Sequence, residues 1–287
     1  MAVIPVKVCG ITRLEDALLC ARLGARAVGF VFYGRSPRAI SPGAAREIAR
    51  RLPPQVKKVG VFVNAKPETM MEVAARVGLD MVQLSGDEPP EVAAAVRGVR
   101  VVKAFRLARM RDLERIKDYT AVHAILVDAA TQGHYGGTGI CADWELARQA
   151  TRYGKPVILA GGLNGGNVTL AIRTVRPSGL DVCTGVEAEP GIKDERKLRA
   201  FFDVIWESSD RIAKLVGLPA RPGGEVVAEV RAASDLSPAE LLARARGEGK
   251  GGGAAGSARP AGDASGEQGG ARDPLLDAPL LDELPPA

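Results

Sequence analysis

Residues 156–187 read PVILAGGLNGGNVTLAIRTVRPSGLDVCTGVE. The stretch contains an apolar run of strand length, a glycine turn, a helical segment, a second strand-length run and a second glycine turn. Pro156–Ala160 is continuously apolar, which is typical of a parallel strand covered on both faces. A strand, a helix and a second strand in this order predict a right-handed βαβ unit. The stretch therefore favours an α/β protein built on a parallel sheet.

The same alternation runs through the first 210 residues. The predicted strands are Ile4–Val8, Ala27–Phe32, Lys58–Val63, Met81–Leu84, Val99–Phe105, Ala124–Asp128, Pro156–Ala160 and Leu180–Cys183. The predicted helices are Leu14–Leu23, Pro42–Leu52, Pro67–Val77, Pro90–Val96, Met110–Lys117, Asp143–Arg152, Asn167–Val175 and Glu195–Trp206. Eight such units match a compact (β/α)8 TIM barrel. The alternative is a doubly wound open sheet, which needs a switch point, and no GxGxxG follows the first strand.

Composition divides the chain into a catalytic barrel domain, residues 1–210, and a largely disordered extension, residues 211–287. Gly and Pro make up about 27% of the extension, a range in which low-complexity chain is expected. Its Leu-rich terminus, Leu275–Leu281, could dock on a protein partner, but a solvated tail is the simpler interpretation. The formal charge of +5 is +7 for residues 1–210 and −2 for the extension. This balance gives no reason to expect a nucleic-acid partner, whereas a basic barrel suits an anionic substrate.

The chain shows no sign of a membrane or secretory segment. No stretch approaches the roughly 18 consecutive apolar residues of a membrane span, and the first residues lack a signal-peptide pattern. Four scattered cysteines then predict reduced thiols and a cytoplasmic location. Two histidines and no CxxC motif offer no metal-binding set.

In a barrel of this class, chemistry lies at the carboxyl ends of the strands. The first strand ends in Lys7-Val-Cys9, and period-two alternation places both side chains inside the barrel. A cation near a thiol favours the thiolate, so Cys9 is a candidate reactive cysteine. A small buried apolar residue is the alternative interpretation. Asp128 closes an apolar run, where packing explains an acid poorly.

Three further groups follow strand ends. Arg38 lies in a loop after the second strand, where a guanidinium can bind a carboxylate bidentately. Gly161 and Gly162 follow the seventh strand and Gly185 follows the eighth, which are the usual positions of a barrel phosphate site. Asp181 faces the same way as Cys183. Because the eighth strand closes against the first, Asp181 is expected to pair with Lys7.

Taken together, the motifs identify a family. The sequence resembles the phosphoribosylanthranilate isomerases of tryptophan biosynthesis over residues 4–207. The matching motifs are Lys7-Val-Cys9-Gly-Ile-Thr12, Gly29-Phe-Val-Phe32, Ser36-Pro-Arg38, Gly60-Val-Phe-Val-Asn64, Val82-Gln-Leu-Ser-Gly86, Leu126-Val-Asp128, Gly136-Gly-Thr-Gly139, Leu159-Ala-Gly-Gly-Leu163 and Gly185-Val-Glu187. Many colinear motifs of this kind are far more specific than any one of them.

The resemblance implies an Amadori rearrangement that converts an aldose to a ketose. It makes Cys9 the general base and Asp128 the general acid, with Arg38 holding the anthranilate carboxylate. Lys7 is also predicted to bind the substrate. The loops with Gly161, Gly162, Thr184 and Gly185 would take the phosphate. No metal, nicotinamide or flavin is required, and family members occur as monomers and homodimers.

This chain departs from the family pattern at two places. Ser85 stands where the family usually has His, and Cys183-Thr184 stands where it usually has Ser-Ser. Thr184 keeps a hydroxyl donor, and neither change touches the predicted acid or base, so we expect activity.

Four other functions are alternatives for a chain with these features. An epimerase of the ribulose-phosphate type would need metal-binding histidines that the sequence lacks. A histidine-pathway isomerase would share the phosphate loops, and a dual-substrate histidine/tryptophan isomerase would be expected to use acids at both strand ends rather than Cys9. A non-catalytic scaffold with a partner-recruiting tail is disfavoured by the presence of Cys9, Asp128 and Arg38.

Overall fold

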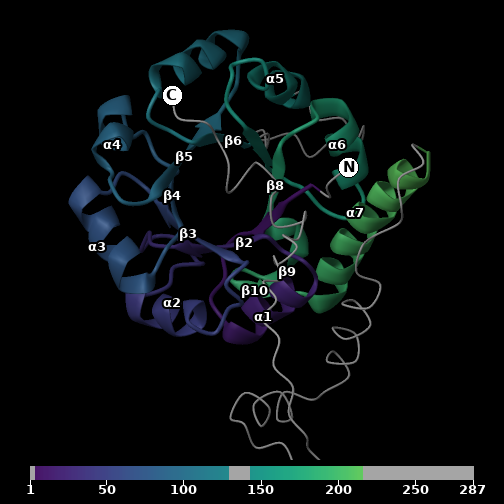
Figure 1. The fold of residues 1–287 in the computed structure, drawn as a ribbon, viewed down its shortest axis with the longest axis horizontal. Coiled ribbons are helices and arrows are strands. Elements are labelled where there is room, and N and C mark those ends of the chain that lie inside the picture. Colours follow the sequence, from purple (N-terminus) through teal and green to yellow (C-terminus); the bar gives the residue numbers. More distant parts are fainter. Residues whose placement is uncertain (1–3, 129–142, 216–287) are drawn as a thin grey trace, which may run out of the picture. The chain divides into compact units, whose positions relative to one another are not determined.

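The computed structural model describes residues 4–128 and 143–215, all of which belong to one compact unit. Eight parallel strands form a closed barrel in the order β1 to β8, with β8 paired to β1. Figure 1 shows the helices arranged around this ring of strands. The predicted (β/α)8 barrel is therefore confirmed, and the open-sheet alternative is wrong. The extension from residue 216 onward lies outside the described residues.

The barrel strands are short and lie within two residues of the predicted bounds. They are β1 (Val6–Val8), β2 (Ala27–Val31), β3 (Lys57–Phe62), β4 (Met81–Leu84), β5 (Arg100–Arg106), β6 (Ala124–Asp128), β7 (Val157–Ala160) and β8 (Gly179–Val182). The helices are α1 (Leu14–Arg22), α2 (Pro42–Ala49), α3 (Pro67–Val77), α4 (Pro90–Ala95), α5 (Asp143–Ala150), α6 (Val168–Val175) and α7 (Glu195–Leu215). Helix α7 extends five residues past Asp210, the predicted end of the barrel domain.

Two features differ from the predicted elements. Between β5 and β6 the chain forms a 3-10 helix, η1 (Met110–Asp118), whose buried residues are Leu113 and Ile116. Residues three apart fall on one line in a 3-10 helix, so this spacing suits the tighter turn. After β8 the chain forms a short 3-10 turn, η2 (Thr184–Val186), and an antiparallel hairpin of β9 (Glu187–Glu189) and β10 (Ile192–Lys193). The hairpin was not predicted.

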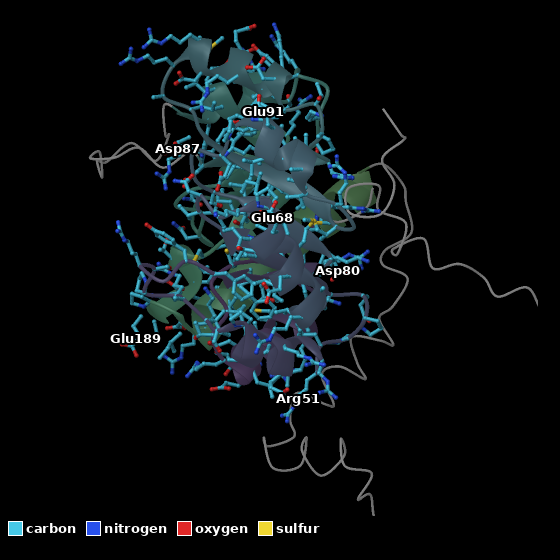
Figure 2. The ribbon with its side chains drawn as sticks, turned by 90° about the vertical axis from the view of Figure 1, so that its left-hand side faces the viewer. Arg51, Glu68, Asp80, Asp87, Glu91 and Glu189 are labelled. Carbon is cyan, nitrogen blue, oxygen red and sulfur yellow. The ribbon has the colours of Figure 1, made fainter. Side chains whose placement is uncertain are left out.

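Apolar side chains fill both sides of the barrel wall. One cluster lies inside the barrel and consists of Ala27, Val59, Met81, Val102, Ala124, Leu126, Ile158 and Ala160. A larger cluster packs the outer face of the strands against the helices. Charged side chains of α3 and α4, such as Glu68 and Glu91, are exposed in Figure 2. The inner side chains stack in layers below the rim, which leaves the carboxyl ends of the strands for polar groups.

A buried ion pair holds the loops after β3 and β4. Lys103 Nζ donates to Glu88 Oε2 at 2.8 Å and to Gly86 O at 2.7 Å, and the two side chains are 2% and 1% exposed. Glu88 Oε1 also accepts from the backbone N–H of Asn64 at 2.8 Å. A buried pair of this kind is costly to break, because the remaining charge has no partner and no water. The pair therefore fixes two of the loops at the rim.

Replacing Lys103 by Met should lower the free energy of unfolding by about 3–5 kcal/mol, because the Glu88 carboxylate stays buried without its cation. The double variant Lys103→Met/Glu88→Gln should recover part of the loss, since no buried charge remains. Urea denaturation measures both. The exposed pair of Lys117 with Glu114 is the control, and Lys117→Met should leave the midpoint close to that of the wild type. A Lys103→Met protein as stable as the wild type would contradict the prediction.

Candidate active site

The predicted site residues gather at the carboxyl ends of the strands. Cys9 follows β1, Arg38 lies in the loop after β2, and Asp128 is the last residue of β6. The glycine loops follow β7 and β8. Going round the closed barrel from β1, Asp128 is reached past β8 and β7, so the acid and the thiol stand on different sides of the mouth. The structure thus places the predicted groups on one rim. Gly136–Gly139 lies outside the described residues.

Cys9 lies directly above a buried ion pair. Lys7 Nζ donates to Asp181 Oδ1 at 2.9 Å, and both side chains are buried, which confirms the predicted pairing. The pairing follows from the parallel register, because Lys7 on β1 lies opposite Asp181 on β8. A Cβ built on Gly29 would come within 2.8 Å of Cys9 Sγ and 3.1 Å of the Lys7 side chain. Only a glycine on β2 leaves room for both groups.

These surroundings determine the protonation of Cys9. A hydrogen bond with Cys183 lowers the pKa of Cys9 well below its usual range. Burial opposes this shift, and the ammonium groups of Lys7 and Lys193 add to it. Burial tends to lower the pKa of Lys7, but the negative charges of Asp181 and Cys9 raise it, so the amine stays charged. Burial raises the pKa of Asp181 to about 7 despite Lys7. Of these groups, Cys9 is the one poised to accept a proton.

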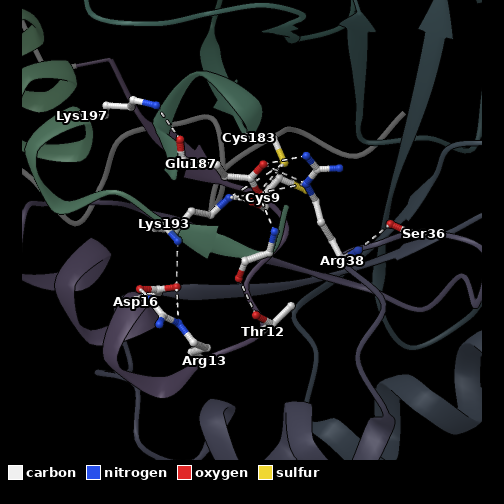
Figure 3. A network of polar contacts seen from close by, with 11 residues as sticks. Cys9, Thr12, Arg13, Asp16, Ser36, Arg38, Cys183, Glu187, Lys193 and Lys197 are labelled. Atoms are coloured by element: carbon white, nitrogen blue, oxygen red, sulfur yellow. Dashed lines mark hydrogen bonds and ion pairs between the residues drawn. The ribbon is translucent and has the colours of Figure 1, made fainter. Parts of the chain in front are cut away.

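A second polar network, drawn in Figure 3, surrounds Glu187. Arg38 donates from Nε at 2.9 Å to Glu187 Oε1 and from Nη2 at 2.6 Å to Glu187 Oε2. Lys193 Nζ donates to Glu187 Oε1 at 2.9 Å and to the carbonyl oxygen of Cys9 at 2.6 Å. The same ammonium lies 3.9 Å from Cys183 Sγ. The network therefore connects Arg38 to the Cys183 thiol and to the backbone of Cys9 through the hairpin after β8.

Glu187 and Lys193 were not predicted as site residues. Glu187 stands in the quoted Gly185-Val-Glu187 motif, so a signal for it was present. Lys193 carries no sequence signal, because it reaches the site only through the β9–β10 hairpin. The structure also changes the surroundings of two predicted residues. Arg38 already holds a carboxylate, that of Glu187, and the Lys7 ammonium lies beneath Cys9 against Asp181.

The charge of Glu187 contributes to stability over a definite pH range. Burial raises its pKa, but hydrogen bonds from Arg38 and Lys193 outweigh burial and lower the pKa from 4.5 to about 2. The unfolded chain therefore protonates Glu187 near pH 4.5 and the folded protein only near pH 2. The stabilisation is complete above pH 4.5 and is lost as the pH falls toward 2.

Glu187→Gln removes this titration, so its free energy of unfolding should fall less steeply than that of the wild type between pH 4.5 and 2. Chemical denaturation at several pH values in this window measures the slope. Glu189→Gln, at an exposed position of the same hairpin that is labelled in Figure 2, is the matched control and should keep the wild-type slope. Equal slopes for Glu187→Gln and the wild type would show that Glu187 does not titrate in this way.

The glycine loops after β7 and β8 meet at the rim. Gly161 and Gly162 have φ angles of 93° and 64°, which favour glycine. A Cβ on Gly185 would collide with the carbonyl oxygen of Leu163, so the two loops approach more closely than any other residue would permit. Thr184 is exposed at the start of η2. Small residues at these two positions let backbone N–H groups approach an anion.

An apolar pocket opens at the amino-terminal ends of the strands, among Val59, Met81 and Ile158. It lies at the end of the barrel opposite the loops described above. Barrels of this class carry their chemistry at the carboxyl ends, so we assign no function to this pocket.

The fold and the rim define a class: a (β/α)8-barrel enzyme with a thiol, an acid and paired glycine loops suited to a phosphorylated substrate. Residues 6–204 match the family model described as N-(5'-phosphoribosyl)anthranilate isomerase. The chain therefore belongs to the N-(5'-phosphoribosyl)anthranilate isomerase family, and the predicted resemblance is confirmed.

Similar proteins agree in length with the described barrel. An isomerase of this family from Geobacter metallireducens is 50% identical over 197 residues, which cover 69% of this chain and 96% of the relative. One from Pseudomonas paraeruginosa is 46% identical over 206 residues, or 71% and 96% of the two chains. The crystal structure of the Thermotoga maritima phosphoribosylanthranilate isomerase is 44% identical with a TM-score of 0.66, covering 70% of this chain and 98% of that one.

A further crystal structure shows a family member in complex with reduced 1-(o-carboxyphenylamino)-1-deoxyribulose 5-phosphate. That protein is 43% identical to this chain with a TM-score of 0.64, over 70% of this chain and 98% of its own. In the part of the chain that the structure describes, no helix is long and apolar enough to cross a membrane.

Proposed function

We propose that the chain isomerises N-(5'-phosphoribosyl)anthranilate to 1-(o-carboxyphenylamino)-1-deoxyribulose 5-phosphate in tryptophan biosynthesis. One observation carries the proposal: Cys9, with its lowered pKa, and Asp128 stand on different sides of one barrel mouth in a chain of this family. An acid and a base on different sides of a sugar are the groups that an aldose–ketose isomerisation needs.

Asp128 and Cys9 act in sequence. Asp128 protonates the furanose ring oxygen, and the ring opens to a Schiff base. Cys9 thiolate then removes the C2' proton, which gives an enolamine that tautomerises to the ketone. Each positioned acid or base typically contributes about 10²–10⁴ in rate. The reaction is internal to the substrate, so these two groups suffice for the proton transfers.

Lys7 acts through Cys9 rather than by direct contact with the substrate. Its ammonium is buried below the thiol and bonded to Asp181, where it stabilises the thiolate. This replaces the predicted substrate-binding role of Lys7 with a positioning role.

The remaining groups hold the two anionic ends of the substrate. The loops with Gly161, Gly162, Thr184 and Gly185 bind the phosphate through backbone N–H groups and the Thr184 hydroxyl. Arg38 binds the anthranilate carboxylate, and its ion pair with Glu187 orients the guanidinium toward the mouth. Ser85, which accepts a hydrogen bond from Gln83 at 3.0 Å, lines the same rim.

The direct test follows the loss of phosphoribosylanthranilate fluorescence on adding the purified full-length protein. Turnover is expected without added metal or cofactor. No turnover would overturn the proposal.

The proposed location is the cytoplasm. The proposed assembly is a monomer or a homodimer, and the Thermotoga maritima relative is described as dimeric.

Deleting residues 216–287 should leave kcat and KM unchanged, because the family match ends at residue 204 and the described rim residues precede residue 194. The deletion keeps all of α7, which ends at Leu215. Steady-state kinetics of the truncated and full-length chains make the comparison. A large loss of kcat would show that the extension serves the barrel directly.

A further inference from the structure

Two cysteines lie side by side at the mouth of the barrel. Cys9 follows β1 and Cys183 follows β8, and Val8 lies opposite Val182 in the parallel pairing of these strands. The backbone N–H of Cys9 donates to the carbonyl oxygen of Val182 at 2.8 Å, so the pairing continues beyond the strand. Figure 3 shows the two side chains together in the polar network, and each thiol shifts the pKa of the other.

The backbone geometry suits a disulfide. Neighbouring strands lie about 4.7–4.9 Å apart, and the Cα atoms of bonded cysteines are usually about 4.4–6.8 Å apart. A Cβ built on Gly10 would come within 3.1 Å of Cys183 Sγ, and one on Gly29 within 2.8 Å of Cys9 Sγ. The sulfur atoms thus occupy space that two glycines leave open. A bond between them requires no large movement of either strand.

The surroundings favour oxidation at this pair. Lys7 and Lys193 both lower the pKa of Cys9, whereas the hydrogen bond with Cys9 and burial raise the pKa of Cys183, so Cys9 is the thiolate of the pair. Cations favour the thiolate, which is the form that reacts with oxidants. Cys183 is partly exposed at the mouth and Cys9 is 8% exposed, so a small solute reaches the pair from solvent.

We propose that a peroxide converts Cys9 and Cys183 to a reversible disulfide, and that this bond stops isomerisation. The second half rests on the proposed role of Cys9 as the general base, because a sulfur bonded to sulfur cannot accept the C2' proton. Cys183 is thereby assigned as the resolving thiol of a redox-sensitive site.

The chemistry takes two steps. Cys9 thiolate attacks the peroxide O–O bond, which forms a sulfenic acid and releases hydroxide or an alkoxide that takes up a proton. Cys183 then attacks the sulfenic sulfur, so the S–S bond forms and water leaves. Two electrons pass from the thiols to the peroxide. Because the second step consumes the sulfenic acid, it protects Cys9 from irreversible oxidation to the sulfinic acid.

A third cysteine provides the internal control. Cys20 is fully buried in α1, and burial raises its pKa to about 12. A buried thiol of this kind is inert to peroxide. Cys141 lies outside the described residues. The test therefore uses a Cys141→Ser background, in which this thiol cannot form a disulfide with Cys9 or Cys183.

The test treats full-length Cys141→Ser protein with hydrogen peroxide and compares it with the same chain carrying Cys183→Ser or, as the control, Cys20→Ala. Peptide mass spectrometry under non-reducing conditions detects a peptide pair that joins Cys9 to Cys183 and has lost two hydrogens. Turnover is expressed relative to each variant's own untreated rate, before and after dithiothreitol.

With Cys183 present, we expect the linked peptides, a rate loss of about tenfold or more because a general base is worth about 10²–10⁴, and recovery with dithiothreitol. Cys183→Ser should lose its rate without recovery and accumulate the Cys9 sulfinic acid. Cys20→Ala should respond like its parent. Absence of the linked peptides, or full recovery of oxidised Cys183→Ser, would overturn the proposal. Linked peptides with an unchanged rate would instead overturn the proposed role of Cys9 and leave the disulfide standing.

Discussion

Cys9→Ala is expected to lower kcat by about 10²–10⁴, because the variant lacks the group that removes the C2' proton. KM should change much less, since Cys9 is 8% exposed and the proposed phosphate and carboxylate contacts remain. The fluorescence assay under saturating substrate measures kcat directly. Circular dichroism of the same preparation shows whether the barrel is intact.

The pH profile separates a base from a packing residue. The wild-type kcat/KM should fall as the pH drops below the lowered pKa of Cys9, because the protonated thiol cannot act as a base. Cys20→Ala removes a thiol of the same size from α1 and should keep the wild-type rate and profile. A Cys9→Ala enzyme at full rate would show that another group is the base.

Asp128→Asn should lower kcat by a similar factor of about 10²–10⁴, because the amide keeps the shape of the side chain but cannot supply the proton that opens the furanose ring. The matched control is Asp80→Asn. Asp80 pairs with Lys58 at the amino-terminal end of β4, away from the mouth, and it is labelled in Figure 2. Steady-state kinetics of both variants make the comparison.

The double variant Cys9→Ala/Asp128→Asn tests whether the acid and the base serve one reaction. Residues that act as a unit are strongly non-additive, so the double variant should be about as slow as the slower single variant. If the kcat loss of the double variant equals the product of the two single-variant losses, the two groups act independently. Asp128→Asn at full rate would exclude Asp128 as the acid.

Local sequence pattern was enough to predict most of the barrel. Apolar runs such as Ala124–Val127, which Asp128 closes, coincide with the observed strands, because a strand covered on both faces needs an apolar side chain at nearly every position. Pro67–Val77 was predicted to the residue, since Pro at its start and Gly78 at its end are standard helix boundaries. Helix α7 and η1 were predicted less well, because nothing local to Trp206 ends the helix and a spacing of three fits either helix type.

The sequence alone likewise predicts the proposed acid, the proposed base and the glycine loops. Strand alternation and barrel closure placed Lys7, Cys9 and Asp181 on the inner face, and the structure shows the ion pair they predict. The partner of Arg38 was not visible. Glu187 and Lys193 reach the rim on a hairpin whose two strands are three and two residues long, too short for a periodic pattern.

Periodicity and residue type therefore specify the strands, the helices and the groups at each strand end, because these depend on neighbours along the chain. The contacts of Cys9 with Cys183, and of Glu187 with Arg38 and Lys193, depend on which strand ends the closed barrel brings together. Cys9 and Cys183 are separated by nearly the whole barrel sequence and become neighbours only when β8 closes against β1. The low pKa of Cys9 arises from that closure, since charge and hydrogen bonding act through space.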